Sequence, residues 1–63
     1  MALTETERDI LRLSSQGYTM EDIAAQLCRS GDTIKTYKKR LFAKLEVRSI
    51  AEALSYATNY KLI

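Results

Sequence analysis

The sequence contains no histidine and no proline, and it has only one cysteine and two glycines. Without histidine there is no imidazole for a catalytic triad or a metal ion, and the single Cys28 can form neither an intrachain disulfide nor a cysteine metal cluster. No pair of a nucleophile and a base can be assembled from the side chains present. The sequence therefore predicts a protein that is not an enzyme and has no catalytic residue, no cofactor and no metal site.

The chain also lacks the length for an enclosed ligand cavity and an apolar run for a membrane. Its 63 residues allow one domain, and a chain of this size buries only about 60% of the surface that its unfolded form exposes. A membrane span needs roughly 18 apolar residues in a row, and no signal-peptide pattern opens the chain. A lone thiol without a secretory signal indicates a reducing compartment, so we expect a cytoplasmic protein without membrane contacts.

The overall composition is typical of a globular protein, and the charged residues are distributed unevenly along the chain. Hydrophobic residues make up 46% of the chain and charged residues 29%, which is too apolar for a disordered protein. Residues 1–28 hold two basic and five acidic side chains, a balance of −3, whereas residues 29–48 hold seven basic and two acidic ones, a balance of +5. Such an asymmetry is the first indication of an anionic partner.

Apolar residues recur at helical spacing in four segments, and the scarcity of glycine and proline favours helices over a sheet. The segments are residues 5–16, 20–28, 31–45 and 50–60. They predict an all-α fold, a compact four-helix domain that occupies residues 1–63. The expected inward residues are Ile10, Leu11, Leu13, Ile23, Ala24, Leu27, Ile50, Ala53, Leu54 and Ala57.

Capping residues stand where these apolar periods begin. In a capping box, a serine or threonine and an acidic residue three positions later satisfy free N–H groups of the first helical turn. The predicted boxes are Thr4 with Glu7, Thr19 with Asp22 and Ser49 with Glu52, and Ser30 is the predicted cap of the third segment. Thr6 with Asp9 matches the same pattern inside the first segment. Gly17 stands where a helix would end in a left-handed conformation.

The third segment has an apolar face and a basic face. On a helical wheel Tyr37, Leu41 and Leu45 fall within about 60° of Ile34 and form an apolar stripe, with Phe42 at its edge. Lys35, Thr36, Lys39 and Ala43 point away from the stripe, and Arg40 borders them. Burying these cations against protein would cost too much without partners, so the basic face is predicted to be exposed.

The connection between the second and third helices is about three residues long, near Arg29 and Ser30. Two short helices joined so tightly, the second of them basic, indicate a helix-turn-helix. The B-DNA major groove admits one α-helix, and lysine can donate to guanine there. Phosphates flank the groove, and free helix N-termini also favour phosphate. The predicted phosphate or groove-edge contacts are therefore Lys38, Arg40 and Lys44, together with the hydroxyls of Thr19, Ser30 and Thr33.

A charged helix face is often only solvated surface, but the charge asymmetry and the short turn favour DNA binding here. Other residues receive a structural interpretation. Cys28 is interpreted as a small apolar filler rather than a reactive thiol. The tyrosines, Tyr18, Tyr37, Tyr56 and Tyr60, are interpreted as packing residues rather than stacking partners of bases.

A longer set of residues carries a family resemblance. The set is Leu3, Thr4, Glu7, Arg8, Asp9, Ile10, Leu11, Gly17, Asp22, Ile23, Ala24, Leu27, Ser30, Thr33, Ile34, Lys35, Lys44, Leu45, Val47, Ala53, Ala57, Leu62 and Ile63. Together these positions resemble the LuxR-type helix-turn-helix domain, also called GerE-like, without a gap from Leu3 to Ile63. The most specific part is residues 30–45.

The resemblance implies a transcriptional regulator whose domain binds duplex DNA as a dimer, with the third helix as the recognition helix in the major groove. Carried over position by position, it implies that Lys35, Thr36 and Lys39 face the bases and that Thr33 and Thr19 contact phosphates. It also implies a dimer contact on the fourth helix, where the candidate residues are Glu52, Ser55, Tyr56 and Asn59.

The family also implies a larger protein around this domain. We expect the chain to be the excised C-terminal domain of a longer regulator, such as a response regulator, that carries an N-terminal signalling domain. Two alternatives stay open. One is a sigma-factor promoter-reading domain, which residues 17–24 fit fairly well, and the other is a small protein-interaction module whose basic helix binds an acidic protein. Salt dependence of duplex binding separates DNA binding from protein interaction.

Overall fold

The computed structural model describes residues 3–62, which form four helices and no strand. The helices are α1 (Glu5–Ser15), α2 (Met20–Gln26), α3 (Gly31–Leu45) and α4 (Ile50–Asn59). The predicted all-α four-helix fold is confirmed. Residues 1–2 and Ile63, the last position of the family resemblance, lie outside the described residues.

All four helices begin at the predicted residue, because their N-caps are the predicted ones. Full capping boxes form at Thr4 with Glu7 and at Thr19 with Asp22. Ser49 accepts the Glu52 N–H at 3.2 Å, but no return bond from the Glu52 side chain forms, so the third predicted box is only half made. The rival pair, Thr6 and Asp9, lies inside α1 and caps nothing.

The helices α1, α2 and α4 end one or two residues before the predicted positions. Each helix ends in a Schellman motif, in which two N–H groups that follow the helix donate hydrogen bonds to carbonyls of its last turn. The left-handed residue of this motif is Gly17 in α1, as predicted, but it is Cys28, Glu46 and Lys61 in the other three. Because non-glycine residues seldom adopt this conformation, no residue type marks the ends of α2, α3 and α4 in the sequence.

Cys28 itself departs from its prediction. It adopts a φ of 55° in the turn after α2, where its N–H donates to Ala25 O at 3.2 Å. Its side chain is exposed, so the interpretation of Cys28 as an apolar filler was wrong. The residue serves the turn through its backbone, and this turn sets the direction in which α3 leaves α2.

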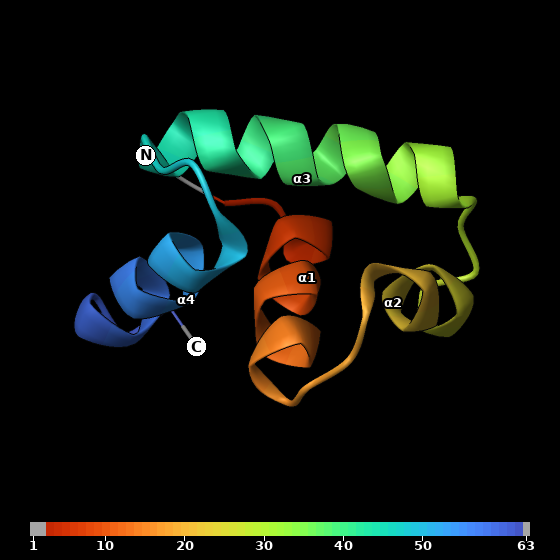
Figure 1. The fold of residues 1–63 in the computed structure, drawn as a ribbon, viewed down its shortest axis with the longest axis horizontal. Coiled ribbons are helices and arrows are strands. Elements are labelled where there is room, and N and C mark those ends of the chain that lie inside the picture. The colour runs from red at the N-terminus through yellow and green to blue at the C-terminus, as the bar shows by residue number, and fades with distance from the viewer. Residues whose placement is uncertain (1–2, 63) are drawn as a thin grey trace.

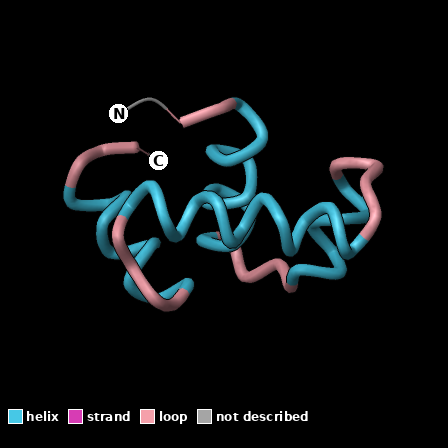
Figure 2. Tube along the Cα trace, turned by 90° about the horizontal axis from the view of Figure 1, so that it is seen from above, coloured by secondary structure: helices cyan, strands magenta, loops and turns pink. Residues whose placement is uncertain are grey.

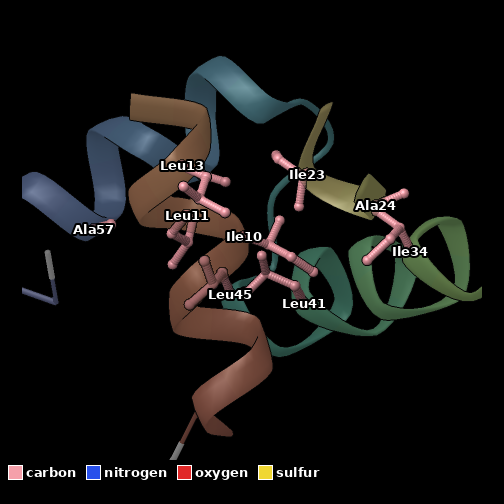
Figure 3. Close-up of a cluster of buried hydrophobic side chains, with 10 residues drawn as sticks. Ile10, Leu11, Leu13, Ile23, Ala24, Ile34, Leu41, Leu45 and Ala57 are labelled. Atoms are coloured by element: carbon pink, nitrogen blue, oxygen red, sulfur yellow. The ribbon is translucent and has the colours of Figure 1, made fainter. Parts of the chain in front are cut away.

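The core lies between α1 and the other three helices, and most of the expected inward residues form it (Figure 3). Ile10, Leu11 and Ile23 have no exposed surface, while Leu27, Ile50 and Leu54 are only partly buried. The buried core consists of Ile10, Leu11, Leu13, Ile23, Ala24, Ile34, Leu41, Leu45, Ala53 and Ala57. Burial of these side chains supplies the main driving force for folding, since each large one contributes about 1.5–3 kcal/mol.

The long helix α3 lies along one side of the molecule. Figure 1 shows α1, α2 and α4 all below it, and Figure 2, seen from above, shows α3 crossing over the other helices. It packs against all three of them. The opposite side of α3 is left without any covering helix in the described part of the chain, and this uncovered side is where the basic residues lie.

Candidate nucleic-acid interface

The position of α3 follows from its apolar stripe. Ile34 and Leu41 have 0% exposed surface and Leu45 has 5%. These three residues recur over three turns of the helix, so their burial fixes its rotation about its own axis. The residues on the other side are therefore held outward by packing from behind.

The outward side of α3 forms a surface that we call the basic face, defined as Lys35, Thr36, Lys39, Arg40 and Ala43. All five residues are exposed. In the described residues 3–62, none of the three cations forms an ion pair with an acidic side chain. Thr36 is the one member tied back to its own helix, since its hydroxyl donates to Asp32 O at 3.1 Å. The basic face thus presents unneutralised charge to any approaching molecule.

The N-terminus of α3 adds hydroxyl groups to one end of this face. Ser30 Oγ accepts the Thr33 N–H at 3.2 Å and lies 2.8 Å from Thr33 Oγ1. The first amides of a helix have no partner within it, and the helix dipole makes this end favourable for an anion. The hydroxyls of Ser30 and Thr33, which are predicted phosphate contacts, therefore lie together at the N-terminus of α3.

The start of α2 carries more negative charge than the start of α3, whose first turn holds Asp32 alone. Thr19 is exposed and caps the helix, as predicted, but its hydroxyl accepts the Asp22 N–H at 3.1 Å. The Asp22 carboxylate accepts a hydrogen bond from the Thr19 N–H at 3.2 Å, and Glu21 lies in the same turn. Two negative charges therefore lie in the first turn of α2, close to where a phosphate contact was predicted.

Lys38 and Lys44 are only partly exposed, in contrast to the cations of the basic face. Lys38 Nζ lies 6.0 Å from the centre of the Phe42 ring, within the range of a cation–π interaction. Lys44 Nζ donates to Glu7 Oε1 at 2.7 Å, although it was predicted as a groove-edge cation. The structure thus brings Lys44 toward α1 rather than to the basic face.

The partner of Lys44 is the one buried charged residue among the described positions. Glu7 is only 1% exposed, and its Oε1 also accepts the Thr4 N–H at 2.8 Å. Burial alone raises the pKa of the Glu7 carboxyl, but the hydrogen bonds from Lys44 and Thr4 and the charge of Lys44 outweigh it and lower the pKa below its ordinary value of 4.5. The pair therefore ties the first turn of α1 to the last turn of α3.

The candidate dimer residues lie on one exposed part of α4. Glu52, Ser55 and Asn59 are exposed, and Tyr56 is half-buried. The Tyr56 ring lies 4.5 Å from that of Tyr60, centre to centre, at an interplanar angle of 31°. Tyr60 is 66% exposed, so the prediction that it is a packing residue was wrong for its outer surface. Tyr18 is also exposed, whereas Tyr37 and Tyr56 do pack against the core.

Arg29 is a residue near the basic face that sequence reasoning did not include. It lies in the turn between α2 and α3, and its guanidinium carbon is 5.4 Å from the centre of the Tyr37 ring. A sequence pattern that could have indicated Arg29 is an arginine directly before the N-cap of a helix, followed by an aromatic residue in the second turn of the same helix. Periodicity within the helix alone could not include a residue outside it.

Taken together, these residues form an exposed, positively charged helix surface. Thr36 and Ala43, which lie between the cations, have small side chains and therefore allow a binding partner to approach the helix closely. In residues 3–62, no helix has both the length and the apolar character that crossing a membrane requires. The chemistry available to the basic face is hydrogen-bond donation and charge attraction toward an anionic partner.

Comparison with known proteins identifies the sequence pattern. Residues 1–57 match the profile described as bacterial regulatory proteins, luxR family (GerE). Relatives include the Fimbriae Z protein of Salmonella typhimurium, 36% identical over 63 residues, and the transcriptional activator protein BglJ of Escherichia coli, 47% identical over 55 residues. The response regulator protein VraR of Staphylococcus aureus is 38% identical over 61 residues.

These relatives are longer than the chain. The matches cover 100%, 87% and 97% of it but only 30%, 24% and 29% of the respective relatives. Among solved structures, the response regulator ChrA of a heme-sensing two-component system superposes with a TM-score of 0.94 at 33% identity. That match covers 100% of this chain and 31% of ChrA. The resemblance predicted from the sequence is thereby confirmed in both sequence and fold.

Proposed function

The chain belongs to the luxR family of bacterial regulatory proteins, and on this basis we propose that it binds duplex DNA with α3 in the major groove and regulates transcription. The observation that carries the proposal is the basic face, whose three cations are exposed and unpaired within the described residues. An α-helix with its side chains is about 10–12 Å across, and the major groove is about 12 Å wide.

Within the groove, we assign Lys35, Thr36 and Lys39 to the bases. Lysine can donate to guanine O6 and N7, and threonine offers a methyl group for thymine. All three side chains are exposed on the side of α3 that faces away from the core. Lys39 lies four residues after Lys35 and three after Thr36, so the three side chains fall within about 100° of one another around the helix.

Around the groove, we assign phosphates to residues at the edges and at the N-terminus of α3. Arg40 is exposed, Lys38 is held near Phe42, and Ser30 and Thr33 stand beside free amides. Thr19 is the weaker candidate because of the carboxylate of Asp22. For Lys44, contact with Glu7 supports a role in holding α3 against α1 in place of the predicted phosphate contact.

We further propose that two copies bind together, each on one half-site. The exposed residues of α4, Glu52, Ser55 and Asn59, with the half-buried Tyr56, supply the dimer contact. In helix-turn-helix dimers the half-sites lie about one helical turn apart, or 10–10.5 bp. Selection of bound duplexes from a random pool, followed by footprinting, gives the site and its symmetry. A selected site without symmetry, protected over one half-site only, contradicts the dimer.

The chain spans less than a third of the relatives described above. Two of the similar proteins, VraR and ChrA, are response regulators by name. We propose that residues 1–63 form the DNA-binding domain of a longer regulator with an N-terminal signalling domain. The full-length gene product is the direct test, since a receiver or ligand-binding domain would precede residue 1 in its reading frame.

Fluorescence anisotropy with a labelled duplex of random sequence tests the DNA-binding proposal itself. Each phosphate contact contributes about −0.9 to the slope of log affinity against log salt, so about four to six contacts give a slope near −4 to −5. Arg8→Ala is the matched control, because it removes one exposed cation on α1 without touching α3. We expect the control to bind like the parent. A basic module for acidic proteins would show no affinity for the duplex at low salt.

A further inference from the structure

The arginine before α3 is held in place from both ends. Its backbone N–H donates to Ala24 O at 2.9 Å, as part of the turn that closes α2. Its guanidinium lies over the ring of Tyr37, with 5.4 Å between the guanidinium carbon and the ring centre. Tyr37 is itself packed against the core. The side chain of Arg29 is therefore fixed against α3, although the residue lies outside that helix.

This arrangement leaves the charge of Arg29 available. A planar guanidinium that stacks on an aromatic face keeps its N–H groups at its edges, where they can donate to an anion. Arg29 is exposed, and within residues 3–62 it forms no ion pair. Stacking also restricts a flexible side chain before any ligand binds, so less entropy is lost when a contact forms.

The position of Tyr37 on α3 places Arg29 beside other proposed phosphate contacts. On a helical wheel, Thr33, Tyr37 and Arg40 lie within about 60° of one another, on one flank of the basic face. The rise of the helix separates Thr33 from Arg40 by about 10 Å along its axis. Arg29 thus adds a cation to the N-terminal part of this flank, next to the cap at Ser30.

We infer that Arg29 is a phosphate-contacting residue of the DNA interface and that Tyr37 is its positioning residue, which acts by holding the guanidinium toward the strand that borders the N-terminal half of α3. The inference rests on the proposed function of DNA binding. The other flank carries a comparable pair, Lys38 with Phe42, but at 6.0 Å and with a half-buried lysine. Arg29 is the more exposed and more closely stacked of the two cations.

The test uses the 63-residue chain and a fluorescein-labelled random-sequence duplex of about 24 bp, long enough for two half-sites. Anisotropy titrations run from about 50 to 200 mM salt. The variants are Arg29→Ala, Tyr37→Leu, Tyr37→Phe and the double variant Arg29→Ala/Tyr37→Leu, with Arg8→Ala as the charge-matched control. Thermal melting followed by circular dichroism reports whether each variant is folded.

We expect Arg29→Ala to weaken binding about fivefold at the lowest salt and to reduce the magnitude of the salt slope by about 0.9, as for one lost phosphate contact. Tyr37→Leu should weaken binding, whereas Tyr37→Phe, which keeps the ring, should bind like the parent. In the Arg29→Ala background, Tyr37→Leu should have no further effect, because a positioning residue acts only through the group that it positions.

Two outcomes overturn the inference while the proposed function stands. They are parent-like affinity and slope for Arg29→Ala, and losses for the two single variants that add in the double variant. If Tyr37→Leu melts below the assay temperature, the comparison of Arg29→Ala with Arg8→Ala tests the role of Arg29. Tyr37→Phe then tests whether the aromatic ring alone is sufficient. A parent chain that does not bind the duplex at any salt overturns the proposed function, and the inference with it.

Discussion

The inward and outward sides of α3 belong to the same 15 residues and differ in almost every physical respect. Inward, Ile34 and Leu41 are fully buried in the apolar core. Outward, Lys35 and Lys39 are exposed and have no ion pair within the described residues. The inward side therefore determines where the helix lies, and the outward side determines what it can bind. Substitutions on the two sides should separate stability from DNA affinity.

The largest effect is expected on the inward side, at Leu41. Leu41→Ala leaves a cavity in the core, and such a change costs about 2–5 kcal/mol of the free energy of unfolding. A domain of this size has little stability beyond that, so urea titration should show a variant that is largely or wholly unfolded. Lys39→Ala, two residues away on the outward side, should change the free energy of unfolding by less than about 0.5 kcal/mol. Equal costs at the two positions would contradict the division of α3.

The second effect concerns Lys44, which pairs with Glu7 and does not belong to the basic face. Lys44→Met leaves the buried Glu7 carboxylate without its ion-pair partner, and an unpaired buried charge costs about 2–3 kcal/mol here. Lys35→Met is the matched control, because it removes the same charge from an exposed position on the same helix. Urea titration should show a loss for Lys44→Met alone. If instead Lys44→Met keeps its stability and loses duplex affinity, Lys44 belongs to the DNA interface.

The third effect concerns DNA affinity and tests the outward lysines Lys35 and Lys39. At a duplex selected for tight binding, Lys35→Ala and Lys39→Ala should each cost about 1–3 kcal/mol of binding free energy and relax the preference at the base pair concerned. Both variants should melt at the parent temperature. Gel-shift titrations measure the affinity. Two variants that bind the selected duplex as tightly as the parent would remove these lysines from the base-reading set.

The smallest effect is the pH dependence of the Glu7 contribution. Because the folded-state pKa of Glu7 is lowered, its charged form stabilises the fold above its ordinary pKa of 4.5, and this stabilisation is lost as the pH falls through the folded-state value. Glu7→Gln should therefore be less stable than the parent at pH about 7, by about 1 kcal/mol. The difference should shrink on acidification below pH about 4.5. A difference that is the same at both pH values would show that the charge of Glu7 contributes nothing.

The fold was largely predictable because its signals are local. A cap such as Thr4 and an apolar period such as that of Ile10 and Leu11 lie within a few residues of the structure they specify. The helix ends were less predictable, since Cys28, Glu46 and Lys61 take a conformation that only glycine signals in sequence. Backbone hydrogen bonds close the helix at each of these residues, and bonds of that kind leave no mark on residue type.

The outward direction of Lys35, Thr36 and Lys39 was also predictable, because the helical period fixes which side chains oppose the buried stripe. Contacts between distant segments were not. The pairing of Lys44 with Glu7 spans 37 positions, and it converts a residue that looks like a surface cation into a link between two helices. The stack of Arg29 on Tyr37 crosses a turn, so a wheel drawn for one helix could not show it.

The most direct measurement of the central claim is an NMR titration of the isotope-labelled chain with the selected duplex. The account predicts that amide shifts change most along residues 29–43, with a second, smaller group at the start of α2, and that the buried side of α1 is unaffected. Shift changes confined to α4 and residues 1–16, with those of residues 29–43 unchanged, would contradict it.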